Sequence, residues 1–370
     1  MKILFSGNTA WGMYNFRRFI FESFIQKGNQ VIVVTPEDKK YQKELNRIGC
    51  QCISIPINAK GKNPLYDFLT YLKYYKILKK EKPDFCFFYT IKPNIYGSMA
   101  AGKLNIPFIP ITTGLGYTFL HKNIISKIAK ILYKKAFKKA NEVWFLNNED
   151  VQSFQQEKIV MGKKLFLLHG EGIPTEHFEY QPFTENTESI FLLSARMLWD
   201  KGVKEFVEAA RIIKQKYPST KFQLLGFVDN KNPKTIPLKQ IQAWEKEGYV
   251  EYLGSTNDVR PYIYKSTCIV LPSYYREGIP FSLLEGAACG KPLITTDNIG
   301  CRDVVENGKN GFLCRIKDPY DLASCMERII NMPIDKLNEM GLYGRKKVEQ
   351  EYDIHLVIEE YHKRIIPNKI

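Results

Sequence analysis

Short apolar runs alternate with longer helical patterns along this 370-residue chain. The runs are rich in β-branched and aromatic residues, and the segments between them repeat apolar positions at helical spacing. In the first half this pattern predicts strands at Lys2–Ser6, Gln30–Thr35, Gln51–Ile57, Asp84–Thr90, Pro107–Thr112, Glu142–Leu146 and Leu165–His169. It predicts helices at Met13–Lys27, Pro64–Lys80, Asn94–Leu104 and Asn123–Ala140. Apolar strands, each followed by a helix, are typical of parallel sheets covered on both faces.

The same alternation restarts in the second half. Strands are predicted at Ser189–Ala195, Lys221–Gly226, Val250–Leu253, Cys268–Pro272 and Pro292–Thr296, and helices at Val203–Tyr217, Leu238–Lys246, Phe281–Cys289, Tyr320–Asn331 and Asp353–Ile365. The polar stretch Gly172–Glu188 lacks periodicity and is the best linker candidate. We therefore predict an α/β protein of two doubly wound, Rossmann-like domains facing across a cleft, at residues 1–172 and 173–352. Residues 353–370 are expected to form a helix that crosses back to the first domain.

Charge is distributed unevenly between the halves. Residues 1–170 hold 27 Lys and Arg against 11 Asp and Glu, which gives +16, whereas the rest of the chain carries −1. An anionic partner is therefore expected to meet the first half. The eight cysteines show no metal-binding spacing and are predicted to be small buried hydrophobes in a reducing compartment. The sequence shows no signal peptide or membrane span, so we expect a cytoplasmic protein, at most peripheral to a membrane.

Two glutamates eight residues apart form the sharpest motif. Glu277 and Gly278 follow a predicted strand, and Pro280 suits the first turn of the helix that carries Glu285. Backbone N–H groups at a helix start attract phosphate or sugar hydroxyls, and we expect this of Phe281, Ser282 and Leu283. Glu285 is expected to accept hydrogen bonds from two vicinal hydroxyls, as a carboxylate does for ribose. The alternative is a solvated loop glutamate and an ordinary helix salt bridge.

Three further strand ends carry candidate chemistry. Arg196 and Lys201 bracket a strand-to-helix turn. The planar guanidinium of Arg196, the point charge of Lys201 and the dipole of the helix start would together bind a diphosphate. The alternative is that both residues are solvated cations. Gly7 and Asn8 follow the first strand, where glycine permits close approach of an anion, although a plain turn is equally compatible. Thr113, Gly114 and Gly116 follow a later strand and would let backbone N–H groups approach a phosphate, unless this loop is a simple connection.

Together, Glu277, Glu285, Arg196, Lys201 and the first glycine turn resemble the retaining GT-B glycosyltransferases of family 4. Within the family, the segments around Arg196, Pro272-Ser273 and Gly114 are most similar to the PglA-like N-acetylgalactosaminyltransferases. The resemblance implies a glycosyltransferase that moves an N-acetylhexosamine from UDP-GalNAc or UDP-GlcNAc to a saccharide on undecaprenyl diphosphate. It implies that Arg196 and Lys201 hold the diphosphate, Glu285 the ribose and Glu277 the donor sugar. No cofactor or metal is implied, because the cationic side chains take that role.

One departure from the family pattern concerns the acceptor side. Many members place a histidine after the fourth strand, where this chain has Lys92 and Asn94. We assign no general-base histidine and take Lys92 and Asn94 as the candidates there, with Thr113, Gly114 and Gly116 as further acceptor contacts.

The basic first half leaves two other kinds of partner to weigh. Tyrosines and lysines are interleaved over Tyr66–Lys80, and lysines form a stripe beside the apolar stripe of Ile125, Ile128, Ala129, Leu132 and Ala136. This composition suits an anionic bilayer surface on the cytoplasmic face of the inner membrane, although the apolar stripes would equally face the sheet. No nucleic-acid-binding motif accompanies the charge. A GT-B sugar-nucleotide epimerase is the second enzyme hypothesis, but it needs acid and base residues that we cannot place.

Overall fold

The computed structural model describes residues 1–58, 61, 63–114, 124–160, 162–184, 188–229 and 232–365. The chain divides into two units, one of residues 1–171 with 354–370 and one of residues 172–353. These divisions lie close to the boundaries expected from the linker and the last helical pattern.

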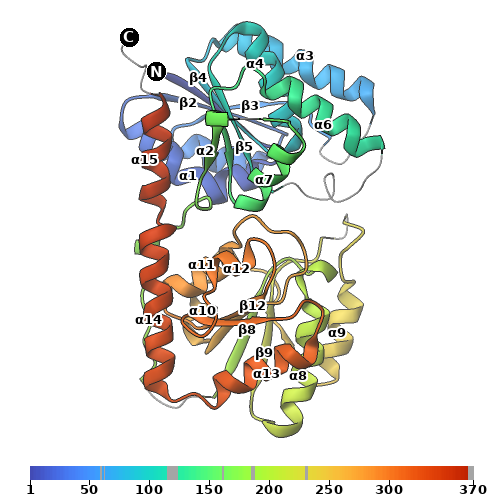
Figure 1. Ribbon diagram of the computed structural model, residues 1–370, viewed down its shortest axis with the longest axis vertical. Helices are drawn as coiled ribbons and strands as arrows, with labels where there is room; N and C mark the ends of the chain where they lie inside the picture. The colour runs from blue at the N-terminus through green and yellow to red at the C-terminus, as the bar shows by residue number, and fades with distance from the viewer. Residues whose placement is uncertain are drawn as a thin grey trace. The chain divides into compact units, whose positions relative to one another are not determined.

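Unit 1 is built on a parallel sheet with the strand order β3-β2-β1-β4-β5-β6-β7 (Figure 1). Its strands are β1 (Lys2–Ser6), β2 (Gln30–Thr35), β3 (Gln51–Ser54), β4 (Phe85–Tyr89), β5 (Phe108–Thr112), β6 (Val143–Phe145) and β7 (Leu165–Leu167). Alternate residues of each strand enter different cores. Phe5 packs on one face of the sheet with Phe21 and Phe87, and Leu4 packs on the other with Tyr74. Burial on both faces explains why these strands are apolar throughout.

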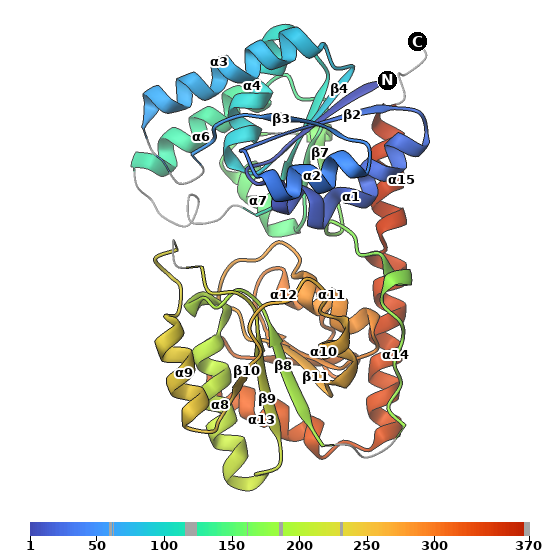
Figure 2. The ribbon, with the colours of Figure 1, turned by 180° about the vertical axis from the view of Figure 1, so that it is seen from behind.

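Helices cover both faces of this sheet (Figure 2). One core takes residues from α1 (Ala10–Gln26), α2 (Lys39–Arg47) and α15 (Ile354–Ile365). The other takes residues from α3 (Pro64–Glu81), η1 (Pro93–Gly97), α4 (Ser98–Leu104), α6 (Ile124–Phe137) and α7 (Asn148–Gln156). The helical pattern predicted from Asn94 thus begins with a π-helical turn, η1, directly after β4.

Unit 2 repeats this plan with the strand order β10-β9-β8-β11-β12-β13. Its strands are β8 (Ile190–Ser194), β9 (Lys221–Leu225), β10 (Glu251–Tyr252), β11 (Cys268–Leu271), β12 (Leu293–Thr296) and β13 (Gly311–Cys314). The helices are α8 (Val203–Lys216), α9 (Leu238–Lys246), α10 (Arg260–Lys265), α11 (Phe281–Ala288), α12 (Cys301–Val304), α13 (Pro319–Ile330) and α14 (Ile334–Glu351). The expected α/β class with doubly wound parallel sheets is therefore confirmed.

The predicted linker is not a free tether. From Gly172 the chain packs along unit 2, where Gln181 donates its backbone N–H to the Cys289 carbonyl and the Arg345 guanidinium donates to the carbonyls of Thr175 and Ala288. Sequence periodicity missed this because an extended segment held by backbone hydrogen bonds has no repeating apolar face. The sequence pattern also led to no prediction for α2, α7, α10, α12, β13 and α14.

The last helix, α15, belongs to unit 1. The Tyr361 hydroxyl lies 2.7 Å from the Tyr89 hydroxyl at the end of β4, and both rings are fully buried. Glu171, the final residue before unit 2, pairs with the buried Arg17 of α1. Burial raises the pKa of Glu171, and the Arg17 guanidinium opposes that rise. The chain leaves unit 1 after Glu171 and returns to it at Ile354. Buried side chains of unit 1 therefore anchor the chain at both of these points.

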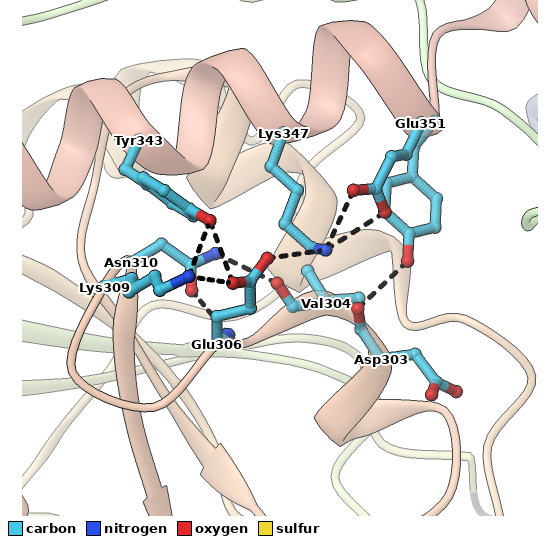
Figure 3. A network of polar contacts seen from close by, with 9 residues as sticks. Asp303, Val304, Glu306, Lys309, Asn310, Tyr343, Lys347 and Glu351 are labelled. Atoms are coloured by element: carbon cyan, nitrogen blue, oxygen red, sulfur yellow. Dashed lines mark hydrogen bonds and ion pairs between the residues drawn. The ribbon is translucent and has the colours of Figure 1, made fainter.

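In unit 2, a polar network ties α14 to the segment before β13 (Figure 3). The Glu306 carboxylate accepts hydrogen bonds from Lys309, Tyr343 and Lys347 at 3.0, 2.8 and 3.1 Å. These donors lower the pKa of Glu306 to about 2. The Tyr352 hydroxyl adds a bond to the Asp303 carbonyl at 3.0 Å.

The cysteines agree with the expectation of small buried hydrophobes: all eight are free, and all but Cys52 are buried. No helix among the described residues is long and apolar enough to cross a membrane. The apolar stripe predicted for α6 is only partly correct. Ala129 and Ala136 are buried, but Ile128 is 52% exposed, because the buried face of the helix is centred on Tyr133 and Phe137.

Candidate active site

Two of the predicted motifs meet at the carboxyl edge of the unit 2 sheet. Lys201 ends the short helix that follows β8, and Glu277 lies in the loop between β11 and α11. The Lys201 ammonium and the Glu277 carboxylate form an ion pair, and their side chains are 14% and 11% exposed. Residues 76 positions apart in the sequence are thus held together where ligands bind in open α/β sheets.

A buried serine that sequence reasoning gave no role holds this pair. The Ser273 hydroxyl, fully buried, donates to Glu277 Oε1 at 2.8 Å. The backbone N–H groups of Tyr274 and Tyr275 both donate to the Asp200 carbonyl at 3.1 Å. The loop after β11 is therefore bonded to the residue just before Lys201. The only sequence signal for Ser273 was its place in the family motif, since a lone serine has no distinctive spacing.

Two glycines let these loops approach closely. Gly202 has φ +76°, and a Cβ there would lie 2.1 Å from the Pro272 carbonyl oxygen. Gly300 has φ +79°, and a Cβ there would lie 1.9 Å from the Gly278 carbonyl oxygen. Any larger residue would push the Lys201 turn or the Glu277 loop out of place.

Arg196 is exposed just beyond the end of β8. Among the residues that the structure describes, no hydrogen bond or ion pair reaches its guanidinium. The nearby Asp200 is buried, and burial raises the pKa of its carboxyl group, while the charges of Lys201 and Arg196 oppose that rise. Arg196 therefore presents a fork of donors that is open to an anion.

The start of α11 differs in part from the expectation. The N–H groups of Leu283 and Leu284 donate to the Pro280 carbonyl at 3.2 and 3.3 Å, and the Leu283 side chain is fully buried. Leu283 is therefore not a free anion donor, because the first turn closes on Pro280. Phe281 and Ser282 are partly exposed at the start of the helix.

Glu285 lies one turn inside α11 and is partly exposed. In the described part of the chain, no hydrogen bond or ion pair involves its carboxylate. Burial raises the pKa of Glu285 to about 7, and the negative charge of Asp258 adds to the rise. A carboxylate left without a partner in this position can accept hydrogen bonds from ligand hydroxyls.

The N–H of the first glycine turn is used within unit 1. Gly7 donates to the Val34 carbonyl at 3.3 Å, and a Cβ at Gly7 would lie 2.6 Å from the Met13 sulfur. Glycine is needed here for packing against α1, and the close approach of an anion at Gly7 stays a prediction. Asn8 is partly exposed beside it.

The acceptor candidates lie at the carboxyl ends of β4 and β5 in unit 1. Lys92 is mostly buried and pairs with Asp67 of α3. Asn94 is 1% exposed and donates to the Ile111 carbonyl at 2.9 Å, while its Oδ1 has no partner among the described residues. Thr113 and Gly114 are partly exposed, and Gly116 lies outside the described residues. The unit thus brings these strand ends together but leaves few free polar groups.

The comparisons with known proteins agree with this geometry. The family model "Glycosyl transferases group 1" matches residues 175–347, and "Glycosyl transferase 4-like" matches residues 2–147. The chain is 28% identical to the N,N'-diacetylbacillosaminyl-diphospho-undecaprenol alpha-1,3-N-acetylgalactosaminyltransferase of Campylobacter jejuni, with 100% of both chains covered. It is 26% identical to the UDP-Gal:alpha-D-GlcNAc-diphosphoundecaprenol alpha-1,3-galactosyltransferase of Escherichia coli, covering 81% of this chain and 79% of that one.

Solved structures share the fold. A glycosyltransferase from Rickettsia africae superposes with a TM-score of 0.81 at 19% identity, covering 100% of this chain and 99% of that one. Anabaena Alr3699/HepE in complex with UDP and glucose superposes with a TM-score of 0.79 at 16% identity, covering 99% and 100%. With two parallel-sheet units and matching family models on both, the chain belongs to the family 4 glycosyltransferases and has the GT-B fold.

Proposed function

We propose that this glycosyltransferase moves an N-acetylhexosamine from a UDP-sugar to a saccharide carried on undecaprenyl diphosphate. The observation that carries the proposal is the Lys201–Glu277 pair on Ser273, next to Arg196, which has no partner among the described residues. The names of the Campylobacter and Escherichia relatives support the acceptor class, and both describe transfer to a diphospho-undecaprenol-linked sugar.

In the proposed reaction the donor diphosphate lies between Arg196 and Lys201. As the bond from the anomeric carbon to the UDP oxygen breaks, negative charge grows on the diphosphate, and these two cations stabilise it. The acceptor hydroxyl oxygen bonds to the same carbon from the same face, so that configuration is retained, and its proton passes to an oxygen of the departing diphosphate. Glu285 holds the ribose hydroxyls and Glu277 the transferred sugar.

The diphosphate also gives the Lys201–Glu277 pair a second role. With no ligand bound, the Glu277 carboxylate neutralises a largely buried ammonium. A bound diphosphate competes for Lys201 and releases Glu277 toward the sugar. Binding of the nucleotide half of the donor thereby prepares the site for its sugar half.

We propose that no metal ion takes part, since cationic side chains stand at the diphosphate position. Activity should therefore persist in excess EDTA. Loss of activity with EDTA that Mn²⁺ or Mg²⁺ restores would overturn this part of the proposal.

The acceptor would be met at the cytoplasmic face of the inner membrane. The +16 charge of residues 1–170 supports contact with an anionic bilayer, where each basic residue near the surface contributes about 1 kcal/mol. The same charge does not by itself favour nucleic acid, for which the chain has no recognition motif.

The test is to assay the purified chain with a panel of UDP- and GDP-sugars and undecaprenyl-diphosphate-linked saccharides. Transfer of a single N-acetylhexosamine, with the α-linkage of the donor retained, is expected. Epimerisation of the donor without an acceptor would favour the epimerase hypothesis, and transfer only to lipid-free sugars would exclude the proposed acceptor.

A further inference from the structure

Large apolar side chains are exposed on the first turn of α3 and along the first half of α6. Leu65 and Phe68 of α3 are 74% and 58% exposed, and Ile124 and Ile131 of α6 are 76% and 67% exposed. Of sixteen exposed large hydrophobic side chains in the described part of the chain, seven lie on the N-terminal halves of these two helices. We call them the apolar patch: Leu65, Tyr66, Phe68, Leu69, Ile124, Ile128 and Ile131.

The topology of unit 1 brings the two helix starts to one edge. Both helices are crossovers between parallel strands, α3 from β3 to β4 and α6 from β5 to β6, so each begins at the carboxyl edge of the sheet. Both pack against η1 and α4 and contribute to the same core. Figures 1 and 2 show them side by side along one flank of unit 1.

The exposed residues follow a pattern of their own. Ile124, Ile128 and Ile131 have the i, i+4, i+7 spacing of one helix face, whereas Ala129 and Tyr133 lie on the buried face. In α3 the first buried residue is Thr70, so the turn before it extends past the core. An apolar face that stays exposed among the described residues of its own chain is typical of an interaction surface.

The charges around the patch favour a lipid surface over another protein chain. Exposed lysines border it on both helices, including Lys73, Lys127, Lys134 and Lys135. A second copy of the chain would bring these like charges together, which opposes self-association through the patch. Anionic headgroups complement them, and apolar and aromatic side chains next to lysines suit the boundary between headgroups and acyl chains.

The patch also adjoins the candidate acceptor residues. Asp67 lies in the same first turn of α3 and pairs with Lys92, which follows β4. We propose that the apolar patch inserts into the membrane that carries the lipid-linked acceptor, while the surrounding lysines meet its headgroups. This inference rests on the proposed function and names the partner of its acceptor side. It differs from a purely electrostatic contact, because insertion of apolar side chains is not screened by salt.

The test is flotation of the full chain with phosphatidylcholine vesicles that contain phosphatidylglycerol. Wild-type binding should persist at about 0.5 M NaCl, where the screening length is only about 4 Å. The double substitution Leu65→Ser and Ile131→Ser should lower vesicle affinity at least about tenfold, because both side chains would leave the acyl boundary. Leu238→Ser, an equally simple change at a residue 44% exposed on unit 2, is the matched control and should leave affinity unchanged.

Further measurements separate insertion from the alternatives. Thermal unfolding and UDP binding should be the same in the double variant and the wild type, since the substituted side chains are exposed. Complete release of the wild type by salt, or equal binding of the double variant, would overturn insertion. A dimer that the double substitution dissociates would assign the patch to a second copy instead. Vesicle binding needs neither donor nor acceptor, so intact binding without sugar transfer would contradict the proposed function and leave the patch standing.

Discussion

The two units present different chemistry at the carboxyl edges of similar sheets. In unit 2 the candidate groups are charged and open to a ligand: Arg196 is exposed, and Glu285 has no partner among the described residues. In unit 1 the charged candidate is already satisfied, because Lys92 is mostly buried against Asp67. What unit 1 exposes beside that edge is the apolar patch.

This difference indicates how one fold serves two kinds of ligand. A soluble, charged nucleotide is best bound by hydrogen-bond donors and acceptors that are held in place by the fold. The free-energy cost of removing water from such groups is already compensated when the protein folds. A ligand carried on a lipid can be located in part through binding of the protein to the membrane. Exposed apolar and basic side chains suit that binding better than a preformed polar pocket. Donor binding is therefore expected to depend mainly on the charged groups of unit 2.

The largest effect is expected from the diphosphate cations. Arg196→Ala or Lys201→Ala should lower kcat by about 10²–10³, the loss typical of one donor to the transition state. Lys204→Ala is the matched control, since Lys204 is exposed on α8 and pairs only with Glu208 among the described residues. Initial rates at saturating donor measure the effect. Normal turnover in both variants would show that the diphosphate does not bind at the turn between Arg196 and Lys201.

The two glutamates should separate binding from turnover. Glu277→Gln should bind UDP at least as tightly as the wild type, because Lys201 loses the carboxylate that competes with the diphosphate. It should turn over slowly, because the Glu277 contact is to the transferred sugar. Ser273→Ala should lower kcat about tenfold in the same direction, since it removes one hydrogen bond to that carboxylate. Glu285→Gln should instead raise the donor KM and weaken UDP binding. Calorimetric titration with UDP, combined with donor kinetics, distinguishes the two roles. An equal loss of UDP affinity in both glutamine variants would assign both glutamates to the nucleotide.

UDP affinity should depend on pH through Glu285. With a pKa of about 7, this group is mostly ionised at pH 8 and mostly protonated at pH 6, so affinity should fall about tenfold between them. Glu285→Gln should lack this component and report only the titration of the phosphate. Because the folded pKa lies above the ordinary 4.5, the ionised group costs stability as pH rises from about 4.5 to 7. The glutamine variant should therefore melt higher than the wild type at pH 8.

The smallest effect concerns the Glu306 network, which includes none of the candidate ligand groups. Glu306→Gln should lower stability by about 1 kcal/mol at pH 7, a modest value because solvent screens this partly exposed carboxylate. The folded pKa is about 2 against an ordinary 4.5, so the stabilisation is present above pH 4.5 and lost as pH falls toward 2. Melting curves would show a shift of about 2–4 °C. Glu339→Gln, which loses only an exposed pair with Lys336, should shift less.

Much of the architecture was readable from local pattern. The apolar runs predicted most strands, because a parallel strand buried on both faces must be apolar throughout. Two kinds of helix were missed: α2, which is amphipathic but has few apolar residues and buries only Leu45, and the long α14. The stretch 172–188 lacked periodicity, so the sequence could not reveal that its first residues are held along unit 2 by backbone hydrogen bonds.

The sequence by itself determined the motifs, since Arg196, Lys201, Glu277 and Glu285 follow strand ends at recognisable spacings. Only the tertiary structure decided which of these groups are satisfied. It pairs Lys201 with Glu277 on Ser273 and leaves Arg196 open, uses the Gly7 and Leu283 N–H groups internally, and turns Ile124, Ile128 and Ile131 outward. The physical reason is that hydrogen bonding and burial depend on neighbours distant in sequence, whereas periodicity and spacing are local properties of the chain.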